Sequence, residues 1–416
     1  MSECKKELAI LVGIYKKSSE LAECETSLTE LSRLVATSGA DTYAKVMQFK
    51  DTYDPRTIIG SGKVAEIKEL VKSSGATLVV FDEELSPAQI RNLENEIEDV
   101  TVLDRSMLIL DIFAIHATSG EGKLQVELAQ LKYTAPRLVG KGQQLSRQGG
   151  GIGSRGPGES KLETDRRHLH EKISNLEARL KELESNRSTM RAQRDRSGLK
   201  KVVLVGYTNA GKSTLLNALT GADVLSEDKL FATLDPTTRK MELPSGEQIL
   251  LTDTVGFIRK LPHHLVKAFK STLDEVRYAD ILLLVSDVSD PEVSEQIKVT
   301  EQVIEELGAG GKPVIYVYNK ADMCGVEDIN TDTENSVTVS AINGAGIDKL
   351  LYAIEEIANR SKKEVKLLIP YTEQHFINQF YSEYVVKNTE YADNGVYVDA
   401  VLDKRGLALY KNYIVY

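Results

Sequence analysis

The chain has no tryptophan, three cysteines and no long apolar run, and each shortage narrows what it can be. The cysteines, at Cys4, Cys24 and Cys324, are too few and too scattered for a disulfide framework and indicate a reducing compartment. No run approaches the roughly 18 apolar residues of a membrane-spanning helix. Lys16 and Lys17 close the first apolar run, and no small-residue cleavage site follows, so it is interpreted as a strand and not as a signal peptide. We expect a cytoplasmic protein without a membrane span, and peripheral contact with a membrane stays open.

Length and charge give the next limits. A chain of 416 residues is too long for one ordinary core, so two or three domains are expected. The net charge of −10 argues against indiscriminate binding of nucleic acid by the whole surface. The six histidines show no spacing typical of a zinc site. Basic side chains nevertheless crowd one short stretch: Arg187, Arg191, Arg194, Arg196, Lys200 and Lys201.

The first part of the chain alternates apolar runs with helical patterns. Strands are predicted at 8–15, 42–49, 77–84 and 100–104, and helices at 21–34, 62–72, after 86–87 and at 105–117. Ser86 suits a helix N-cap and Pro87 the first turn. This alternation is typical of a small α/β domain with a parallel sheet.

A charged arm follows this domain. Leu124–Leu131 has a helical pattern, a glycine-rich stretch comes next, and residues 162–196 are rich in Glu, Arg, Lys and Leu. An apolar stripe, Ile173, Leu176, Leu180 and Leu183, predicts one packed face. The arm is either one long helix or a hairpin broken near 184–186.

The rest of the chain predicts a doubly wound sheet and a small appendage. Strands are expected at 201–206, 241–245, 247–253, 280–287, 312–320 and 336–341, with room for helices between them. The last segment is rich in tyrosine and predicts an α+β unit with strands at 366–370 and 395–403 and a helix at 373–386 between them. The expected domains are residues 1–140, 141–199 with the glycine-rich loop and arm, 200–361 and 362–416.

One motif indicates the chemistry. GYTNAGKS, from Gly206 to Ser213, fits G-x-x-x-x-G-K-[ST] and lies between an apolar strand and a helical stretch, which is the setting of a phosphate-binding loop. Glycine lets backbone amides wrap phosphate, and the helix dipole adds positive potential. Lys212 is placed to bridge the β- and γ-phosphates, and the Ser213 hydroxyl to ligate Mg²⁺.

Further strings follow in the order of a GTPase. DTVG ends a strand, so Asp253 would hold a magnesium-bound water and the Gly256 amide would meet the γ-phosphate. NKAD ends another strand, and a carboxylate at Asp322 can accept both donors of guanine, which adenine lacks. The string Ser340–Ile342 would place backbone amides under the guanine carbonyl.

The motifs resemble translation-factor-related GTPases and, more closely, the HflX family. GYTNAGKSTLLNAL, FATLDPTTR, DTVGFIRKLPHHLV and GGGIGSRGPGESKLE are similar to that family's signatures, and only the C-terminal piece is weakly matched. The resemblance implies a P-loop GTPase that binds GTP and GDP, binds the large ribosomal subunit and its RNA, and in some members splits stalled or idle ribosomes. It implies Mg²⁺ as cofactor and a monomer, with Lys212 and Gly256 as catalytic residues. The expected GTP-binding residues are Gly206, Tyr207, Thr208, Asn209, Ala210, Gly211, Lys212, Ser213, Phe231, Ala232, Thr233, Leu234, Asp235, Asp253, Thr254, Val255, Gly256, Asn319, Lys320, Ala321, Asp322, Ser340, Ala341 and Ile342.

Three positions decide finer points. Thr233, Thr237 and Thr238 compete to complete Mg²⁺ coordination beside Ser213, and resemblance to the family string FATLD favours Thr233. Phe257 stands where many GTPases place a glutamine that orients water, so we expect slow intrinsic turnover stimulated by a partner, although the ring can equally pack under the switch. Asn209 either helps to hold K⁺ against the phosphates or only shapes the loop.

The glycine-rich stretch RQGGGIGSRGPGESK lacks GK[ST] and a preceding buried strand. Its cations, Arg147, Arg155 and Lys161, suit an RNA backbone, so we expect loop and arm to contact ribosomal RNA. The alternative is a flexible linker with solvated charges. Two other functions stay open for the whole chain: an ATP-driven RNA-remodelling enzyme, which NKAD argues against, and a GTP-gated scaffold that does not hydrolyse.

Overall fold

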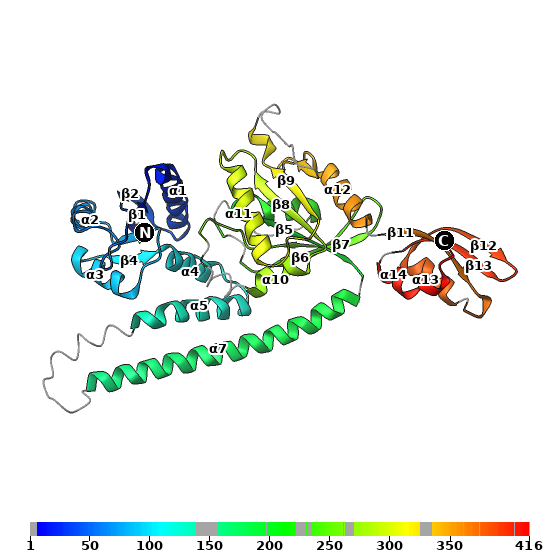
Figure 1. Ribbon diagram of the computed structural model, residues 1–416, viewed down its shortest axis with the longest axis horizontal. Helices are drawn as coiled ribbons and strands as arrows, with labels where there is room; N and C mark the ends of the chain where they lie inside the picture. Colours follow the sequence, from blue (N-terminus) through cyan, green and yellow to red (C-terminus); the bar gives the residue numbers. More distant parts are fainter. Residues whose placement is uncertain are drawn as a thin grey trace, which may run out of the picture.

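The computed structural model describes residues 6–138, 157–196, 198–221, 230–231, 234–260, 262, 270–324, 335–360, 362–373, 375–402 and 404–415. They form three sheets in chain order, with a pair of long helices running beneath the first two (Figure 1). The α/β class that the sequence predicts is confirmed, because two of the sheets are largely parallel and carry helices on both faces.

The N-terminal sheet has the strand order β2-β1-β3-β4, and all its pairings are parallel. Its strands are β1 (Leu8–Tyr15), β2 (Asp41–Phe49), β3 (Leu78–Phe81) and β4 (Thr101–Asp104), and its helices are α1 (Leu21–Thr37), α2 (Ser61–Ser74), α3 (Pro87–Ile97) and α4 (Arg105–His116). Ser86 caps α3 with Pro87 in the first turn, as the sequence predicts. Helices α2 and α3 share one core with the sheet, while α1 and α4 share another core on the opposite face.

The second of these cores does not stop at the domain. Beside Leu28 of α1 and Phe113 of α4 it includes Phe231, Val255 and Ile258, which belong to the middle unit. The face of α1 and α4 is therefore shared between two units. This sharing places the N-terminal domain against the loops that carry the chemistry.

The arm consists of α5 (Gly120–Leu138) and α7 (Pro157–Arg196), which lie side by side (Figure 1). The hairpin alternative is wrong, because α7 continues through 184–186, where no glycine or proline forces a break. Leu176 of the predicted stripe is buried. Ion pairs join the two helices: Lys132–Glu177 at 2.6 Å, Lys172–Glu127 at 2.7 Å and Arg187–Glu121 at 3.0 Å.

The middle sheet has the order β10-β9-β8-β5-β7-β6, and only β6 runs antiparallel. Its strands are β5 (Lys200–Gly206), β6 (Thr237–Glu242), β7 (Gln248–Asp253), β8 (Ile281–Asp287), β9 (Val314–Asn319) and β10 (Ser336–Thr338). Helices α8 (Lys212–Thr220) and α12 (Ile347–Asn359) cover one face, and α10 (Lys270–Tyr278) and α11 (Val293–Glu306) cover the other. The strand predicted at 241–245 begins four residues earlier, because Thr237–Arg239 continue the pairing with β7.

The C-terminal unit is a three-stranded antiparallel sheet, β11-β13-β12, backed by α13 (His375–Glu383) and α14 (Lys404–Leu409). Strands β11 (Lys363–Ile369) and β13 (Gly395–Leu402) were expected, whereas β12 (Val385–Ala392) was missed. Its polar, mostly exposed residues hide the strand period, and α13 is shorter than the predicted 373–386.

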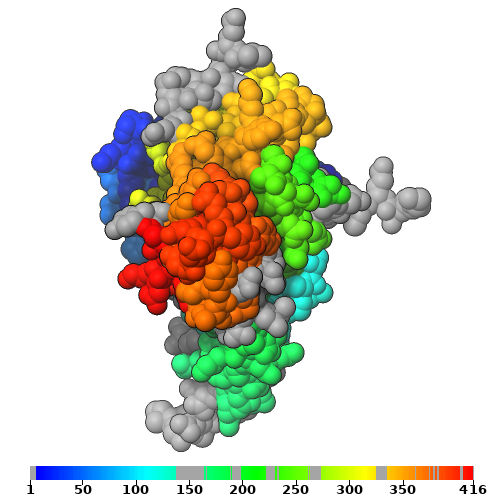
Figure 2. Space-filling view, turned by 90° about the vertical axis from the view of Figure 1, so that its right-hand side faces the viewer, coloured from blue at the N-terminus to red at the C-terminus, as the bar shows by residue number. Residues whose placement is uncertain are grey.

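The space-filling view shows the C-terminal unit, orange to red, in front of the middle unit, with α7 in green projecting below (Figure 2). Among the described helices none combines the length and apolar character needed to cross a bilayer.

Candidate nucleotide-binding site

The loop between β5 and α8 has the form of a phosphate cradle. It runs from Gly206 at the end of the strand to Lys212 at the start of the helix. Gly211 has φ +86°, and a Cβ there would lie 2.3 Å from Nδ2 of Asn319. Asn209 also has a positive φ of 62°, which asparagine tolerates better than most residues. Both the backbone conformation and the space at Gly211 therefore require the glycine that the motif specifies.

Lys212 is buried beneath this loop. Its Nζ donates to the carbonyl oxygens of Gly206 at 3.1 Å and Tyr207 at 2.8 Å, so the side chain curls back along the loop. Burial lowers the pKa of Lys212 to about 8, and the nearby charge of Asp253 opposes this shift only in part. A buried ammonium held mainly by carbonyl oxygens has capacity for an anion.

An acid and a hydroxyl meet at the mouth of the loop. Ser213 Oγ donates to Oδ2 of Asp253 at 2.7 Å, and Asp253 is fully buried at the end of β7. Hydroxyl and carboxylate oxygens are the ligand types that Mg²⁺ takes, so this pair fits the ion that the sequence predicts. Thr238 instead pairs with Thr252 across β6 and β7, at 2.9 Å between the hydroxyl oxygens. This pairing argues against Thr238 as the mobile magnesium ligand.

Gly256 lies directly against the phosphate loop. A Cβ at this position would lie 2.8 Å from Cα of Thr208 and 3.0 Å from Nζ of Lys212, so only glycine allows this approach. The next residue, Phe257, donates its N–H to the Gly206 carbonyl at 3.1 Å and accepts the Thr208 N–H at 2.8 Å. Its ring is 1% exposed and packs beside α10 and α11. Phe257 therefore packs under the switch, which was one of the two expectations for this residue. It offers only backbone groups to this site.

The motifs at the ends of β9 and β10 contact the phosphate loop and each other. Asn319 is 2% exposed, and its amide donates to the Ala210 carbonyl at 2.9 Å and accepts the Ala341 N–H at 3.1 Å. One side chain thus ties the phosphate loop to the segment 340–342. Ser340 Oγ donates to Asp322, and that contact orients the carboxylate. Asp322 itself is exposed, and so is Ile342 at 77%.

Lys320, of the same NKAD motif, contacts the end of a neighbouring strand. It adopts φ +64° and its Nζ contacts Asp287 at 2.7 Å, at the end of β8. Among the residues that the structure describes, the predicted loops 206–213, 253–256, 319–322 and 340–342 lie together at the carboxyl ends of β5, β7 and β9 and beside β10. This is the edge where parallel α/β sheets bind ligands.

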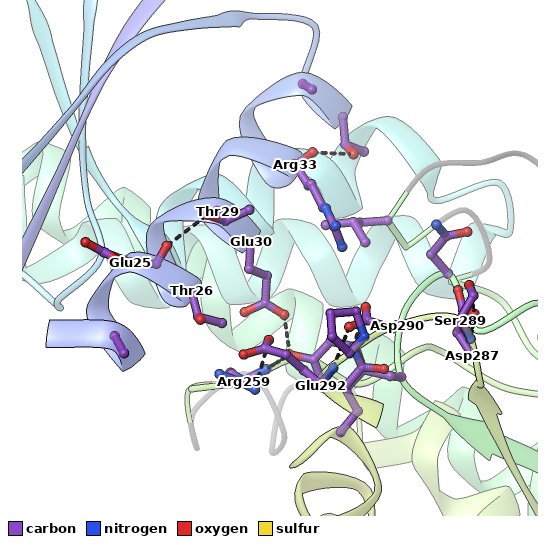
Figure 3. A pocket seen from close by; sticks show the side chains of 18 residues that line it. Glu25, Thr26, Thr29, Glu30, Arg33, Arg259, Asp287, Ser289, Asp290 and Glu292 are labelled. Atoms are coloured by element: carbon purple, nitrogen blue, oxygen red, sulfur yellow. Dashed lines mark hydrogen bonds and ion pairs between the residues drawn. The ribbon is translucent and has the colours of Figure 1, made fainter. Parts of the chain in front are cut away.

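A cavity of about 1020 Å³ lies between α1 and this edge (Figure 3). Asn209 and Tyr207 of the phosphate loop line it, with Arg33 and Glu30 from α1. On the opposite wall Arg259 pairs with Glu292 at 3.1 Å. The N-terminal domain therefore forms one side of the space next to the phosphate loop.

The segment around the predicted switch threonine also turns toward the N-terminal domain. The ring of Phe231 packs edge-to-face on Phe113, with 4.7 Å between centroids. Asp235 accepts the N–H groups of Thr118 at 3.1 Å and Ser119 at 2.7 Å, just before α5. Whether Phe231, Leu234 and Asp235 also face a nucleotide stays a prediction. Ala232 and Thr233 lie outside the described residues, and so do Arg147, Arg155 and the side chain of Lys161.

The sequence interpretation missed a group of charges at this contact, of which the arginine and the carboxylates are buried. Arg105, 2% exposed at the start of α4, donates to Asp82 at 2.7 Å and also to Glu30. Lys260 Nζ, from the segment after Phe257, reaches Asp82 at 2.5 Å. Acids at the end of the strand 77–84 were the only sequence signal, and no local spacing connects them to residues so distant in the chain.

Family models match almost the whole chain. A model described as "GTP-binding GTPase N-terminal" matches residues 25–114, and one described as "GTP-binding GTPase Middle Region" matches 116–194. A "50S ribosome-binding GTPase" model matches 201–320, and an "HflX C-terminal domain" model matches 326–407.

Curated relatives match over similar lengths. A "GTPase HflX" of Caldanaerobacter subterraneus subsp. tengcongensis is 49% identical over 99% of this chain and 94% of its own length. A "GTPase HflX" of Lacrimispora saccharolytica is 48% identical over 95% of this chain and 93% of its own length. A GTP-binding protein from Sulfolobus solfataricus, solved with GDP, is 25% identical and covers 85% of this chain and 99% of its own, with a TM-score of 0.44, too low to bear on the site.

Proposed function

The chain belongs to the HflX family of GTPases, and from this premise we propose that it binds the large ribosomal subunit and couples GTP binding and hydrolysis to ribosome remodelling. The chain is a GTP phosphohydrolase with a P-loop domain. The finer proposal is that it splits stalled or idle ribosomes into subunits. It is supported by the ribosome named in the description that matches residues 201–320.

GTP recognition is the part of the proposal that the geometry supports best. Lys212 would donate to the β- and γ-phosphates, and the Gly256 amide would meet the γ-phosphate; a Cβ at Gly256 would come within 3.0 Å of Lys212 Nζ. Asp322, oriented by Ser340, would accept the two guanine donors. The remaining contacts proposed are those predicted from the sequence in the loops 206–213, 231–235, 253–256, 319–322 and 340–342.

Mg²⁺ would be held by Ser213 and by Thr233, with Asp253 accepting from a bound water, and the ion would supply charge stabilisation on the phosphates. The Ser213–Asp253 contact at 2.7 Å supports this arrangement. K⁺ beside Asn209 is proposed with it, supported by the position of Asn209 on the cavity next to the phosphate loop. Comparing turnover in potassium and sodium buffers tests the K⁺ site.

Hydrolysis by this chain is proposed to be slow unless a partner stimulates it. Phe257 has no side chain able to hydrogen-bond the attacking water, and its ring packs inside the domain. The water must then be oriented by backbone groups of the switch or by a bound partner. Stimulation of single-turnover hydrolysis by ribosomes supports this proposal, and fast hydrolysis that ribosomes leave unchanged contradicts it.

The arm and the glycine-rich loop are proposed to contact ribosomal RNA through Arg147, Arg155 and Lys161. The support is the arm itself: α7 carries exposed Arg166, Arg167 and Arg179 along a helix of 40 residues held to α5 by ion pairs. Such a helix presents positive charge far from the GTPase sheet. The domain limits at 140, 199 and 361 are proposed from the sequence, and the monomeric state is proposed from the resemblance to the family.

Co-sedimentation tests the main proposal. The full chain is spun with ribosomal subunits in the presence of a non-hydrolysable GTP analogue or GDP, and the analogue is expected to favour binding to the large subunit. The triple variant of Arg147, Arg155 and Lys161 to alanine should weaken binding and reduce its salt dependence. A matched triple variant, Lys298, Lys349 and Arg360 to alanine, removes the same charge from α11, α12 and the residue that follows α12. Equal binding with both nucleotides would contradict a GTP-gated ribosome factor.

A further inference from the structure

The segment that follows Phe257 is held through the backbone N–H and the backbone carbonyl of Arg259. The Arg259 N–H donates to the hydroxyl of Tyr207 at 2.7 Å, and the Arg259 carbonyl accepts from Nη2 of Arg105 at 3.2 Å. Tyr207 belongs to the phosphate loop, and Arg105 belongs to the N-terminal domain. Two units of the molecule therefore fix the same residue, three positions after Gly256.

Glu30 of α1 bonds to both Tyr207 and Arg105. Its carboxylate accepts from the Tyr207 hydroxyl with one oxygen and from Arg105 with the other. Figure 3 shows Glu30 pointing from α1 toward the segment that carries Arg259. Tyr207 is 6% exposed and Arg105 is 2% exposed, so water competes little for these contacts. We call Glu30, Arg105 and Tyr207 the relay.

The Tyr207 hydroxyl has two roles that no other part of its side chain could fill. It donates its proton to Glu30 and accepts the Arg259 N–H at the same time. Burial, together with the charge of Glu30, raises the pKa of Tyr207, so the phenol keeps its proton and can donate. Phenylalanine would occupy the same space and lose both hydrogen bonds. The P-loop motif leaves this position free, so the motif does not explain a tyrosine here.

The position of the relay suggests what it does. Gly256 and Phe257 contribute only backbone to the site, so the direction of the Gly256 amide depends on how the following residues are held. We infer that Tyr207 and Glu30 are positioning residues for GTP hydrolysis, which fix the Arg259 backbone and thereby the Gly256 amide opposite the γ-phosphate. This inference rests on the proposed GTP site. It assigns a role to the N-terminal domain within the hydrolytic step.

The test removes one hydroxyl. Full-length Tyr207→Phe is compared with the parent for single-turnover GTP hydrolysis, affinity for a fluorescent GTP analogue and thermal unfolding. The hydrolysis rate constant is expected to fall roughly tenfold, the effect of losing a hydrogen bond to a charged group. Because Tyr207 lies in the phosphate loop, affinity is measured separately, and the fall in the rate constant at saturating GTP should exceed any fall in affinity. Tyr316→Phe is the matched control: it removes a hydroxyl that donates to Glu301 at 2.6 Å in the same domain.

A second variant keeps the inference open to refutation if Tyr207→Phe folds poorly. Glu30→Gln retains the size of the side chain and loses its charge, and it should slow hydrolysis in the same way. Because the two residues act through one contact, the double variant should be no slower than Tyr207→Phe alone. Parent-like hydrolysis in Tyr207→Phe, a parallel loss of rate, affinity and melting temperature, or additive effects in the double variant would each overturn the inference. A parent chain that does not bind GTP would instead refute the proposed site.

Discussion

Two buried cations show how differently the nucleotide site and the contact with the N-terminal domain are built. Lys212 is 6% exposed on the nucleotide face, and Arg105 is 2% exposed on the face shared with the N-terminal domain. Burial lowers the pKa of Lys212 to about 8, and the charge of Asp253 opposes this only in part. Burial acts on Arg105 in the same direction, but Glu30 and Asp82 outweigh it and raise the pKa of the guanidinium.

The difference separates a binding site from a structural contact. The charge of Lys212 is incompletely balanced, which favours an arriving phosphate. The charge of Arg105 is already balanced by the carboxylates of Glu30 and Asp82, so it holds parts of the molecule together. Burial of a basic residue therefore does not by itself indicate a binding site, because the partners of its charge decide whether it can bind a ligand.

The largest expected effect is the loss of Arg105. Arg105→Met leaves Glu30 and Asp82 buried without their common partner, which should destabilise the fold by about 3–5 kcal/mol. Chemical denaturation of the full chain measures this change. The control is Arg56→Met, which breaks the exposed pair with Glu96 at 2.9 Å and should cost less than about 1 kcal/mol. Equal stability of the two variants would remove the contrast between the two faces.

The next effect lies on the nucleotide face. Asp322→Asn replaces one acceptor with a donor, so affinity for GTP should fall about a hundredfold, the scale of lost paired hydrogen bonds in a specific site. Xanthosine triphosphate, which carries a carbonyl in place of the guanine amine, should recover much of that affinity. Nucleotide titration followed by fluorescence or calorimetry gives both numbers. Asp348→Asn, at an exposed position of α12, serves as the control and should change neither affinity.

A smaller effect follows from the pKa of Lys212. Phosphate is held by the charged ammonium, so affinity for GDP should fall as pH rises through about 8. Between pH 7 and pH 9 the dissociation constant should rise about tenfold, because each pH unit above the pKa removes tenfold of the charged form. Guanosine, which lacks phosphate, gives the contribution of base titration and is subtracted. If the ratio of the GDP and guanosine dissociation constants stays the same from pH 7 to pH 9, Lys212 is not the phosphate ligand.

The smallest effect tests the N-terminal side of the contact. Burial, and then the charge of Asp82, raise the pKa of Glu83 to about 7. A carboxyl with a raised pKa in the folded protein contributes its full stability below about pH 4.5, and that stability is lost as pH rises through about 7. Glu83→Gln should therefore be more stable than the parent at pH 8, on the order of 1 kcal/mol for this half-buried group after solvent screening.

Thermal unfolding at pH 8 and pH 4.5 measures this difference, which should shrink toward the lower pH. The neighbouring exposed substitution Glu84→Gln provides the control. A Glu83→Gln variant that is less stable than the parent at pH 8 would show that the charged carboxylate is favoured at this contact.

Much of the fold was predictable because its signals are local. The alternation of strands and helices to residue 117, the cap at Ser86 with Pro87 and the strand–loop–helix at Gly206–Ser213 follow from neighbouring residues. Strand β12 was missed because its polar sequence carries no clear period of two. The unbroken α7 was only one of two expectations, since its stripe suits a helix and a helical hairpin equally.

The sequence by itself determined the nucleotide chemistry: a glycine loop, a lysine, a serine and carboxylates at strand ends, each required by the ligand it would contact. Only the tertiary structure decided that Tyr207 and Arg105 both meet Glu30. Tyr207 lies 177 positions from Glu30 along the chain, and Arg105 lies 75 positions from it. A hydrogen bond acts over about 3 Å, and no local pattern in the sequence records which distant residues come within that reach.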